Sequence, residues 1–200
     1  DKPITIDDVL SSRMIAEPLH LLEIVSPATG GGAFIVTRAD LARRGRNRPV
    51  YLLGAGEAGE HSSVTRAPSI THSLVKPASE RAFRMAGITP DQVDFVQPYD
   101  CYTITVLVTL EDAGFCKKGE GGPFVAEHDL TWCGDLPCNT HGGQLSFGQP
   151  GIAGGMSHVI EGVRQLMGRG GERQIADASL GYVNGNGGIM AEQCSLILGL

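Results

Sequence analysis

The sequence has few aromatic residues and few positive charges. Aromatic residues make up 6% of its 200 residues, with a single tryptophan, and 16 lysines and arginines stand against 22 aspartates and glutamates, for a formal net charge of −6. Nucleic-acid-binding surfaces are built from clustered lysine and arginine. The one basic run, residues 43–48, is typical of a helix end followed by a solvent-exposed loop. The composition therefore argues against a nucleic-acid partner.

Disulfide, metal and membrane signals are also missing. The five cysteines are an odd number spread over half the chain, whereas secreted disulfide frameworks are usually even and dense, so a cytoplasmic protein is predicted. Cys133 and Cys138 have no second cysteine or histidine pair at zinc-finger spacing, and no metal site is predicted. No apolar run reaches the roughly 20 residues that span a bilayer. The chain starts at Asp1 without a methionine or a signal peptide, which predicts a fragment, a processed chain or part of a longer protein.

Glycine, by contrast, is abundant, with 28 residues that interrupt or precede apolar segments. Strand patterns alternate with helix patterns, which indicates an α/β layered fold. Residues 4–21 are expected to form an irregular arm, residues 57–75 a long loop and residues 185–188 a glycine-rich turn. The predicted strands cover residues 32–37, 50–56, 93–97, 174–176 and 190–198, and the predicted helices cover residues 38–43, 76–86, 103–113 and 151–167.

Three polar, glycine-flanked segments follow predicted strands or precede predicted helices: residues 99–102, 141–151 and 182–188. Ligands of open α/β sheets bind beyond the carboxyl ends of the strands, so these segments are the candidate site. Cys101 is expected at a helix N-terminus, where the helix dipole would favour its thiolate. Cys101 is then a nucleophile or proton shuttle, or alternatively a buried, inert cysteine.

Four segments resemble sterol-carrier-protein-linked thiolases of the thiolase superfamily. Residues 94–103 resemble the segment around their motif His-Asp-Cys-Phe, and residues 139–151 resemble their Asn-Pro-Ser-Gly-Gly and Gly-His-Pro segment. Residues 185–188 match their last glycine-rich turn, and residues 7–19 match the linker into the second half. The resemblance covers nearly the whole chain in the family's order.

The resemblance implies a five-layer α-β-α-β-α sandwich, assembled as dimers, of which this chain supplies the C-terminal repeat. Residues 1–30 are then a linker or arm, and residues 31–200 are the thiolase C-terminal-like domain. The family's nucleophilic cysteine lies in the first half, in a Cys-x-Ser context. None of the five cysteines has serine two residues on, so the nucleophile is expected from an N-terminal half or a second chain.

The candidate catalytic residues depart from the family at two histidines. Gln149 replaces the histidine of Gly-His-Pro and keeps an N–H donor for a thioester oxygen, but it cannot act as a base. Tyr99 replaces the histidine of His-Asp-Cys-Phe and can donate a hydrogen bond or a proton. Cys101 remains where these thiolases place their acid/base cysteine. His141 is either a substitute donor or a loop histidine satisfied by the backbone.

The remaining candidates support the site. Asp100 is expected to cap and order its loop rather than act as a base. Gly148, Asn184, Gly187 and Gly188 are expected to shape the loops and an oxyanion hole. The other histidines are expected to be structural or exposed: His20, His61, His72, His128 and His158.

The resemblance leaves three functions open. The first is a thiolase-type acyltransferase that makes or breaks a C–C bond beside an acyl-CoA carbonyl, with coenzyme A as substrate or product and no cofactor. The second is retro-aldol cleavage of a β-hydroxyacyl-CoA, which needs no acylated cysteine. The third is a non-catalytic thiolase-like subunit. Related proteins with altered sites associate with a small OB-fold, zinc-ribbon protein, so such a partner is also expected.

Overall fold

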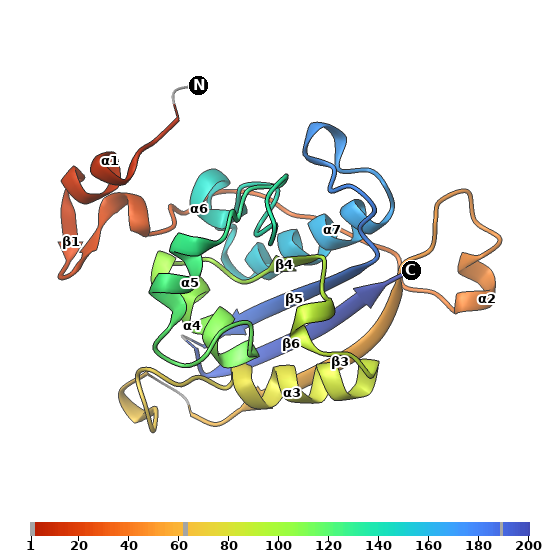
Figure 1. The fold of residues 1–200 in the computed structure, drawn as a ribbon, viewed down its shortest axis with the longest axis horizontal. Helices are drawn as coiled ribbons and strands as arrows, with labels where there is room; N and C mark the ends of the chain where they lie inside the picture. Colours follow the sequence, from red (N-terminus) through yellow and green to blue (C-terminus); the bar gives the residue numbers. More distant parts are fainter. Residues whose placement is uncertain (1–2, 62–63, 189) are drawn as a thin grey trace.

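The computed structural model describes residues 3–61, 64–188 and 190–200. Its centre is a four-stranded sheet in the order β3-β6-β5-β4 (Figure 1). The strands are β3 (Tyr51–Gly59), β4 (Phe95–Gln97), β5 (Leu180–Gly187) and β6 (Glu192–Gly199). β6 pairs antiparallel with both β3 and β5, whereas β4 and β5 run parallel. The sheet is therefore mixed, with the parallel pair at one edge.

Helices cover both faces of this sheet. α3 (Val75–Ala86) and α4 (Thr103–Ala113) pack on one face, and α7 (Gly154–Leu166) packs on the other (Figure 1). Successive strand residues point to opposite faces, so neighbouring residues of each strand enter two separate cores. Val96, Tyr182 and Ile197 pack towards α3 and α4, and Phe95, Val183 and Leu198 pack towards α7. The result is three α-β-α layers, as expected for one repeat of a thiolase-like sandwich.

Two glycines bring α3 unusually close to β3. A Cβ added at Gly54 would lie 2.1 Å from the Ala82 carbonyl oxygen, and one added at Gly56 would lie 1.9 Å from that of Ala78. No side chain fits at either position, so the helix rests directly on the backbone of the strand.

Short elements complete the chain. Near the N-terminus, α1 (Ile6–Ser11) and the hairpin of β1 (Met14–Ala16) and β2 (Leu19–His20) project from the body (Figure 1). The other short elements are η1 (Leu21–Glu23), α2 (Ala39–Ala42), η2 (Val64–Arg66), η3 (Pro90–Gln92), α5 (Gly121–Glu127), α6 (Gly143–Phe147), η4 (Gly151–Ala153) and η5 (Gly171–Arg173). No helix in the described ranges is long and apolar enough to cross a membrane.

Most of the predicted elements are confirmed. α3 ends at Gly87 and α4 at Gly114, both in the left-handed conformation that glycine favours. The helix predicted over residues 38–43 is α2, and the one over residues 151–167 is η4 followed by α7. The basic run of residues 43–48 is exposed, as predicted.

Four expectations were wrong. The apolar segment 32–37 is not a strand, and Ile35 is 93% exposed. Residues 174–176 form no strand either, because the strand of that region begins at Leu180. The glycine-rich turn expected over 185–188 lies mostly in β5, since Gly185 and Gly187 pair with β6 along the ladder. The arm over residues 4–21 is not irregular, because a capping box between Thr5 and Asp8 starts α1.

The buried side of α7 also differs from the sequence pattern. The apolar stripe predicted this side from Ile152 through Leu166, but Ile152 is fully exposed and Met156 lies at the surface. Val159, Val163 and Leu166 of the predicted stripe do pack into the core. The helix also buries three polar side chains spaced three and four residues apart, His158, Glu161 and Gln165. This polar stripe lies beneath the candidate site, where His158 contacts Asp100 and Glu161 contacts Thr140.

Candidate active site

The loop after β4 brings Tyr99, Asp100 and Cys101 together between the sheet and α4. All three residues of β4 are buried, and Cys138 continues the sheet edge beside Val96 through a parallel bridge. The segment that contains His141 therefore starts next to the loop of Tyr99. The Thr105 hydroxyl donates to the carbonyl oxygen of Tyr99 at 3.1 Å and fixes the loop against the first turn of α4.

Asp100 is buried and orders the start of α6. Its Oδ1 accepts the backbone N–H of Gln144 at 2.9 Å, and its Oδ2 accepts that of Leu145 at 3.1 Å. Gly143 has φ of +65°, and an added Cβ there would lie 2.0 Å from Oδ2 of Asp100. These hydrogen bonds confirm that Asp100 orders its loop, and they require glycine at position 143.

His158 completes this arrangement from α7. It is fully buried, and its Nε2 lies 3.2 Å from Oδ1 of Asp100 and 3.1 Å from Nε2 of Gln144. An amide nitrogen only donates, so Nε2 of His158 accepts the hydrogen bond from Gln144, and the same nitrogen lies in close contact with the Asp100 carboxylate. The burial of His158 agrees with the expected structural role, and the structure adds its contact with Asp100.

Tyr99 and Gln149 form the central pair. Nε2 of Gln149 donates to the Tyr99 phenol oxygen at 2.5 Å. The arm fixes Gln149, because its N–H donates to the Ser26 carbonyl at 2.8 Å and its carbonyl accepts the Ala28 N–H at 3.0 Å. Burial, with the nearby Cys101 as a second cause, raises the pKa of Tyr99. The phenol therefore keeps its proton at neutral pH, and this proton is not used in the bond from Gln149.

Cys101 lies beside Tyr99 in an environment that favours the thiol. Its Sγ is 3.9 Å from the Thr105 hydroxyl and 4.0 Å from Nδ2 of Asn186. Burial raises the pKa of Cys101, and this effect exceeds that of the hydrogen bonds that lower it. The prediction that the helix dipole favours its thiolate was therefore wrong, because desolvation dominates.

His141 lies next to His158, with ring centroids 5.3 Å apart. Neither ring nitrogen has a hydrogen-bond partner among the described residues, so the expectation of a backbone-satisfied histidine was wrong. Burial, followed by the charge of His158, lowers the pKa of His141 to about 4. His141 is therefore neutral at pH 7, with one N–H to donate and one nitrogen to accept.

The comparison with protein families decides where this chain belongs. Residues 56–200 match the family model described as "Thiolase C-terminal domain-like". The chain belongs to this family. The match covers the four-stranded sheet except residues 51–55 of β3, and it includes every candidate catalytic residue.

Known proteins agree with this family. The chain is 35% identical over 92% of its length to an acetyl-CoA acetyltransferase of Methanothermobacter thermautotrophicus, and covers 49% of it. It is 39% identical over 84% of its length to 17-hydroxy-3-oxo-4-pregnene-20-carboxyl-CoA lyase of Mycobacterium tuberculosis, and covers 44% of it. The solved Ltp2-ChsH2(DUF35) aldolase is similar with a TM-score of 0.84 and 30% identity, over 99% of this chain and 52% of that one. The chain thus spans about half the length of the relatives it matches.

The other candidate residues of this thiolase-like domain lie beside the arm or within and after β5. Gly148 has φ of +94°, and an added Cβ there would lie 2.5 Å from the Ala28 side chain, so glycine lets the arm pass. Asn184 is buried within β5 and donates to Oε1 of Gln193 and to the Cys194 carbonyl, each at 3.3 Å, away from Tyr99. Gly187 ends β5, and Gly188 follows in the exposed turn.

Sequence reasoning missed several parts of the site. Asn186 is the residue of the last glycine-rich segment that reaches Cys101, and Gln144 and His158 hold Asp100. The spacing of His158, Glu161 and Gln165 was a usable signal, because polar residues at positions i, i+3 and i+7 share one helix face.

Glu161 and Gln165 of the polar stripe of α7 belong to a buried hydrogen-bond network beneath the site. The Thr140 hydroxyl donates to Oε1 of Glu161 at 2.7 Å, and Nε2 of Gln165 donates to the same oxygen at 3.0 Å. Nε2 of Gln97, from the end of β4, donates to the Thr140 hydroxyl at 3.2 Å. The network ties α7, β4 and the His141 segment into one rigid support, because buried polar groups that lose a partner are costly.

Proposed function

We propose that the protein containing this chain cleaves a C–C bond of a β-hydroxyacyl-CoA by a retro-aldol reaction, with Tyr99 as a proton donor. The observation that carries the proposal is the Tyr99–Gln149 pair. The phenol is held at 2.5 Å by an amide that donates to its oxygen, and its raised pKa keeps its own proton available. A neutral phenol in a buried site is suited to donate to a thioester enolate.

The reaction balances without a redox or acyl-enzyme step. A base takes the proton of the β-hydroxyl, the Cα–Cβ bond breaks, and the hydroxyl carbon becomes a carbonyl. The electron pair of the broken bond moves into the thioester as an enolate, and a proton returns to Cα. The products are an aldehyde or ketone and a shortened acyl-CoA, so no cofactor beyond the CoA thioester is required.

Two of the similar proteins support this chemistry. The mycobacterial relative is named a carboxyl-CoA lyase, and a Thermomonospora curvata relative, 36% identical over 84% of this chain, is named a steroid side-chain-cleaving aldolase. The site fits a reaction without an acylated cysteine, because Gln149 stands where the thiolases that it resembles carry a histidine that helps activate their nucleophilic cysteine.

Thiolysis is the second candidate, and the acetyl-CoA acetyltransferase relative favours it. In that reaction Cys101 moves the α-proton, and Gln149 with neighbouring amides holds the enolate oxygen. The nucleophilic cysteine then comes from an N-terminal half or a second thiolase-like chain. Transfer of the acyl group to free CoA by the intact protein would identify thiolysis and exclude the retro-aldol proposal.

The proposal includes partners and a compartment. We infer a thiolase N-terminal half or a second thiolase-like chain, a dimeric assembly and, as in the complex named Ltp2-ChsH2(DUF35), an additional subunit. A small OB-fold, zinc-ribbon protein is the expected form of that subunit, and the cytoplasm is the expected compartment. Native mass spectrometry of protein purified from its source tests the assembly directly.

The catalytic proposal is tested with Tyr99→Phe in the intact protein. The assay separates CoA thioesters by chromatography and follows loss of a β-hydroxyacyl-CoA and gain of the shortened product. We expect kcat to fall about 100-fold or more, as typical when a proton-transfer group is lost, while the far-ultraviolet circular dichroism is unchanged. Tyr51→Phe is the matched control, since Tyr51 accepts only a surface hydrogen bond from Arg43. Full activity of Tyr99→Phe would contradict the proposal and favour a non-catalytic subunit.

A further inference from the structure

A second feature, next to Cys101, is an apolar pocket of about 270 Å³ between the 67–74 loop and α4. Its apolar lining includes Pro68, Ile70 and Leu74 from the loop, Ile104 and Val108 from α4, and Met190 from the turn before β6. Ile70 is 86% exposed and Ile104 is 49% exposed, so two large aliphatic side chains stand uncovered at this pocket. Exposed aliphatic groups around a hollow are typical of a binding site.

Two lining residues of the pocket, Thr105 and Met190, contact Cys101 or its neighbour Asn186. Thr105 lines it, and the hydroxyl of Thr105 lies 3.9 Å from Sγ of Cys101. Met190 also lines it, and its Sδ accepts from Nδ2 of Asn186 at 3.1 Å, the same nitrogen that lies 4.0 Å from Cys101. The pocket therefore begins one residue away from Cys101, within reach of a group attached to a thioester bound there.

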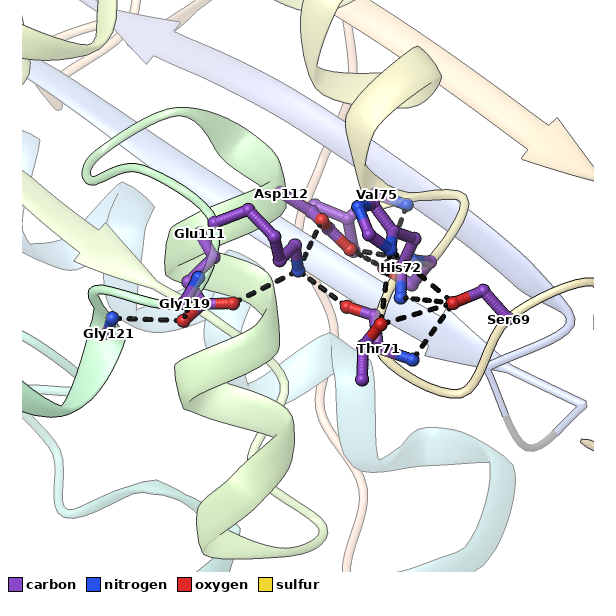
Figure 2. A network of polar contacts seen from close by, with 10 residues as sticks. Ser69, Thr71, His72, Val75, Glu111, Asp112, Gly119 and Gly121 are labelled. Atoms are coloured by element: carbon purple, nitrogen blue, oxygen red, sulfur yellow. Dashed lines mark hydrogen bonds and ion pairs between the residues drawn. The ribbon is translucent and has the colours of Figure 1, made fainter.

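A charged network holds the loop wall of the pocket in place (Figure 2). Oδ2 of Asp112 accepts from the Ser73 N–H at 2.6 Å and from the Ser73 hydroxyl at 2.8 Å. Nζ of Lys118 lies 2.6 Å from Oδ1 of Asp112 and donates to the Thr71 carbonyl at 2.6 Å. Glu111 adds a 3.1 Å ion pair to Lys118.

This network is mostly shielded from water. The Asp112 side chain is 1% exposed and the Lys118 side chain is 28% exposed. Charge-assisted hydrogen bonds of this kind are stronger than neutral ones. They attach the loop to α4 at Ser73 and Thr71, so the width of the pocket is set before any ligand binds.

We propose that this pocket binds the apolar end of the acyl group of a CoA thioester and selects short aliphatic or single-ring groups. The inference rests on the proposed function for the identity of the thioester. Its volume is below the roughly 300–1,000 Å³ of pockets for drug-sized ligands. It corresponds to about nine water-sized volumes, so a chain of about eight carbons fills it. Lys118 and Asp112 act as positioning residues that fix this limit.

The first experiment measures binding, because binding does not depend on catalysis. Saturated acyl-CoAs, which lack the β-hydroxyl and cannot be cleaved, are titrated into the intact protein by isothermal calorimetry. We expect Kd to fall about fourfold for each added methylene, up to about eight carbons, and then to rise. A Kd independent of chain length would overturn the inference, including the case in which another part of the protein already fills the pocket.

A matched pair of variants localises the effect. Ile70→Asp places a charge at the pocket and is expected to weaken binding of the eight-carbon thioester at least tenfold, with little change for acetyl-CoA. Ile35→Asp is the control, since Ile35 is 93% exposed, does not line the pocket and should bind like the wild type. Equal effects of the two variants on the eight-carbon thioester would refute the assignment. Lys118→Met should flatten the chain-length preference by releasing the loop.

The same chain-length series of β-hydroxyacyl-CoAs then separates the two proposals. If none is cleaved but saturated thioesters show the preference and the Ile70→Asp loss, the pocket stands and the retro-aldol function fails. If cleavage occurs with kcat/KM independent of tail length, the function stands and the pocket inference fails.

Discussion

Replacing Gly143 by alanine should destabilise the protein and disturb the site together. The left-handed backbone of Gly143 costs a residue with a Cβ roughly 1–2 kcal/mol. The new Cβ would also lie 2.0 Å from Oδ2 of Asp100, so the carboxylate has to move. That movement weakens its bonds to the N–H groups of Gln144 and Leu145, and each hydrogen bond to a charged group contributes about 1.5–3 kcal/mol.

The expected loss is therefore about 3 kcal/mol or more in the free energy of unfolding. Urea denaturation followed by circular dichroism measures it as a lower midpoint with an unchanged slope. The activity should fall as well, because Asp100 also holds His158 and precedes Cys101 in the same loop.

Gly122→Ala is the matched control. Gly122 lies in α5 without a positive φ, and an added Cβ there meets no atom within 4 Å. Alanine is the better helix former, so this variant should change stability by less than about 1 kcal/mol, in the stabilising direction. A Gly143→Ala protein as stable as the Gly122→Ala protein would refute the reasoning about the Asp100 loop.

Three further predictions follow from buried polar groups. Tyr182→Phe should lower the free energy of unfolding by only about 1 kcal/mol, because Ser79 and Ser195, which hydrogen-bond to Tyr182, also hydrogen-bond to each other at 3.0 Å. Thermal unfolding measures this change, and a loss above about 3 kcal/mol would contradict the prediction. Cys101 should react with iodoacetamide more slowly than the exposed Cys133 at pH 8, with a rate that keeps rising above about pH 8.5, since burial raises its pKa; peptide mass spectrometry would reveal the opposite order. Because the pKa of His141 is lowered in the folded state, His141 contributes stability above about pH 6.5, and up to about 3 kcal/mol of it is lost as the pH falls towards 4. The variant His141→Phe should lose this pH dependence of the free energy of unfolding, measured by urea denaturation. The same pH dependence in the variant and the wild type would exclude His141 as its source.

The sequence predicted helices well where local signals end them. Gly87 and Gly114 stop α3 and α4 where the pattern expected, because a left-handed C-cap depends on a single residue. It failed where apolar residues have no partner in the described chain. Residues 32–37 have the composition of a strand, yet no neighbouring strand pairs with them. A strand requires a partner for its backbone, and composition does not supply one.

The candidate site was likewise predicted only where its signals are local in the sequence. The family resemblance selected Tyr99, Cys101 and Gln149, because their motifs are contiguous in the sequence. The contact between Tyr99 and Gln149 joins residues 50 positions apart, and His158 reaches Asp100 from another helix, so neither follows from a local pattern.

The sequence by itself determined the family, the main helices and the identity of the reactive groups. Only the tertiary structure decided their protonation and their pairing. The thiol of Cys101 and the phenol of Tyr99 have raised pKa values, and His141 has a lowered one, with burial as the first cause in each case. Desolvation depends on what surrounds a group in space, and the surroundings of these three come from the arm, the sheet edge and α7 together.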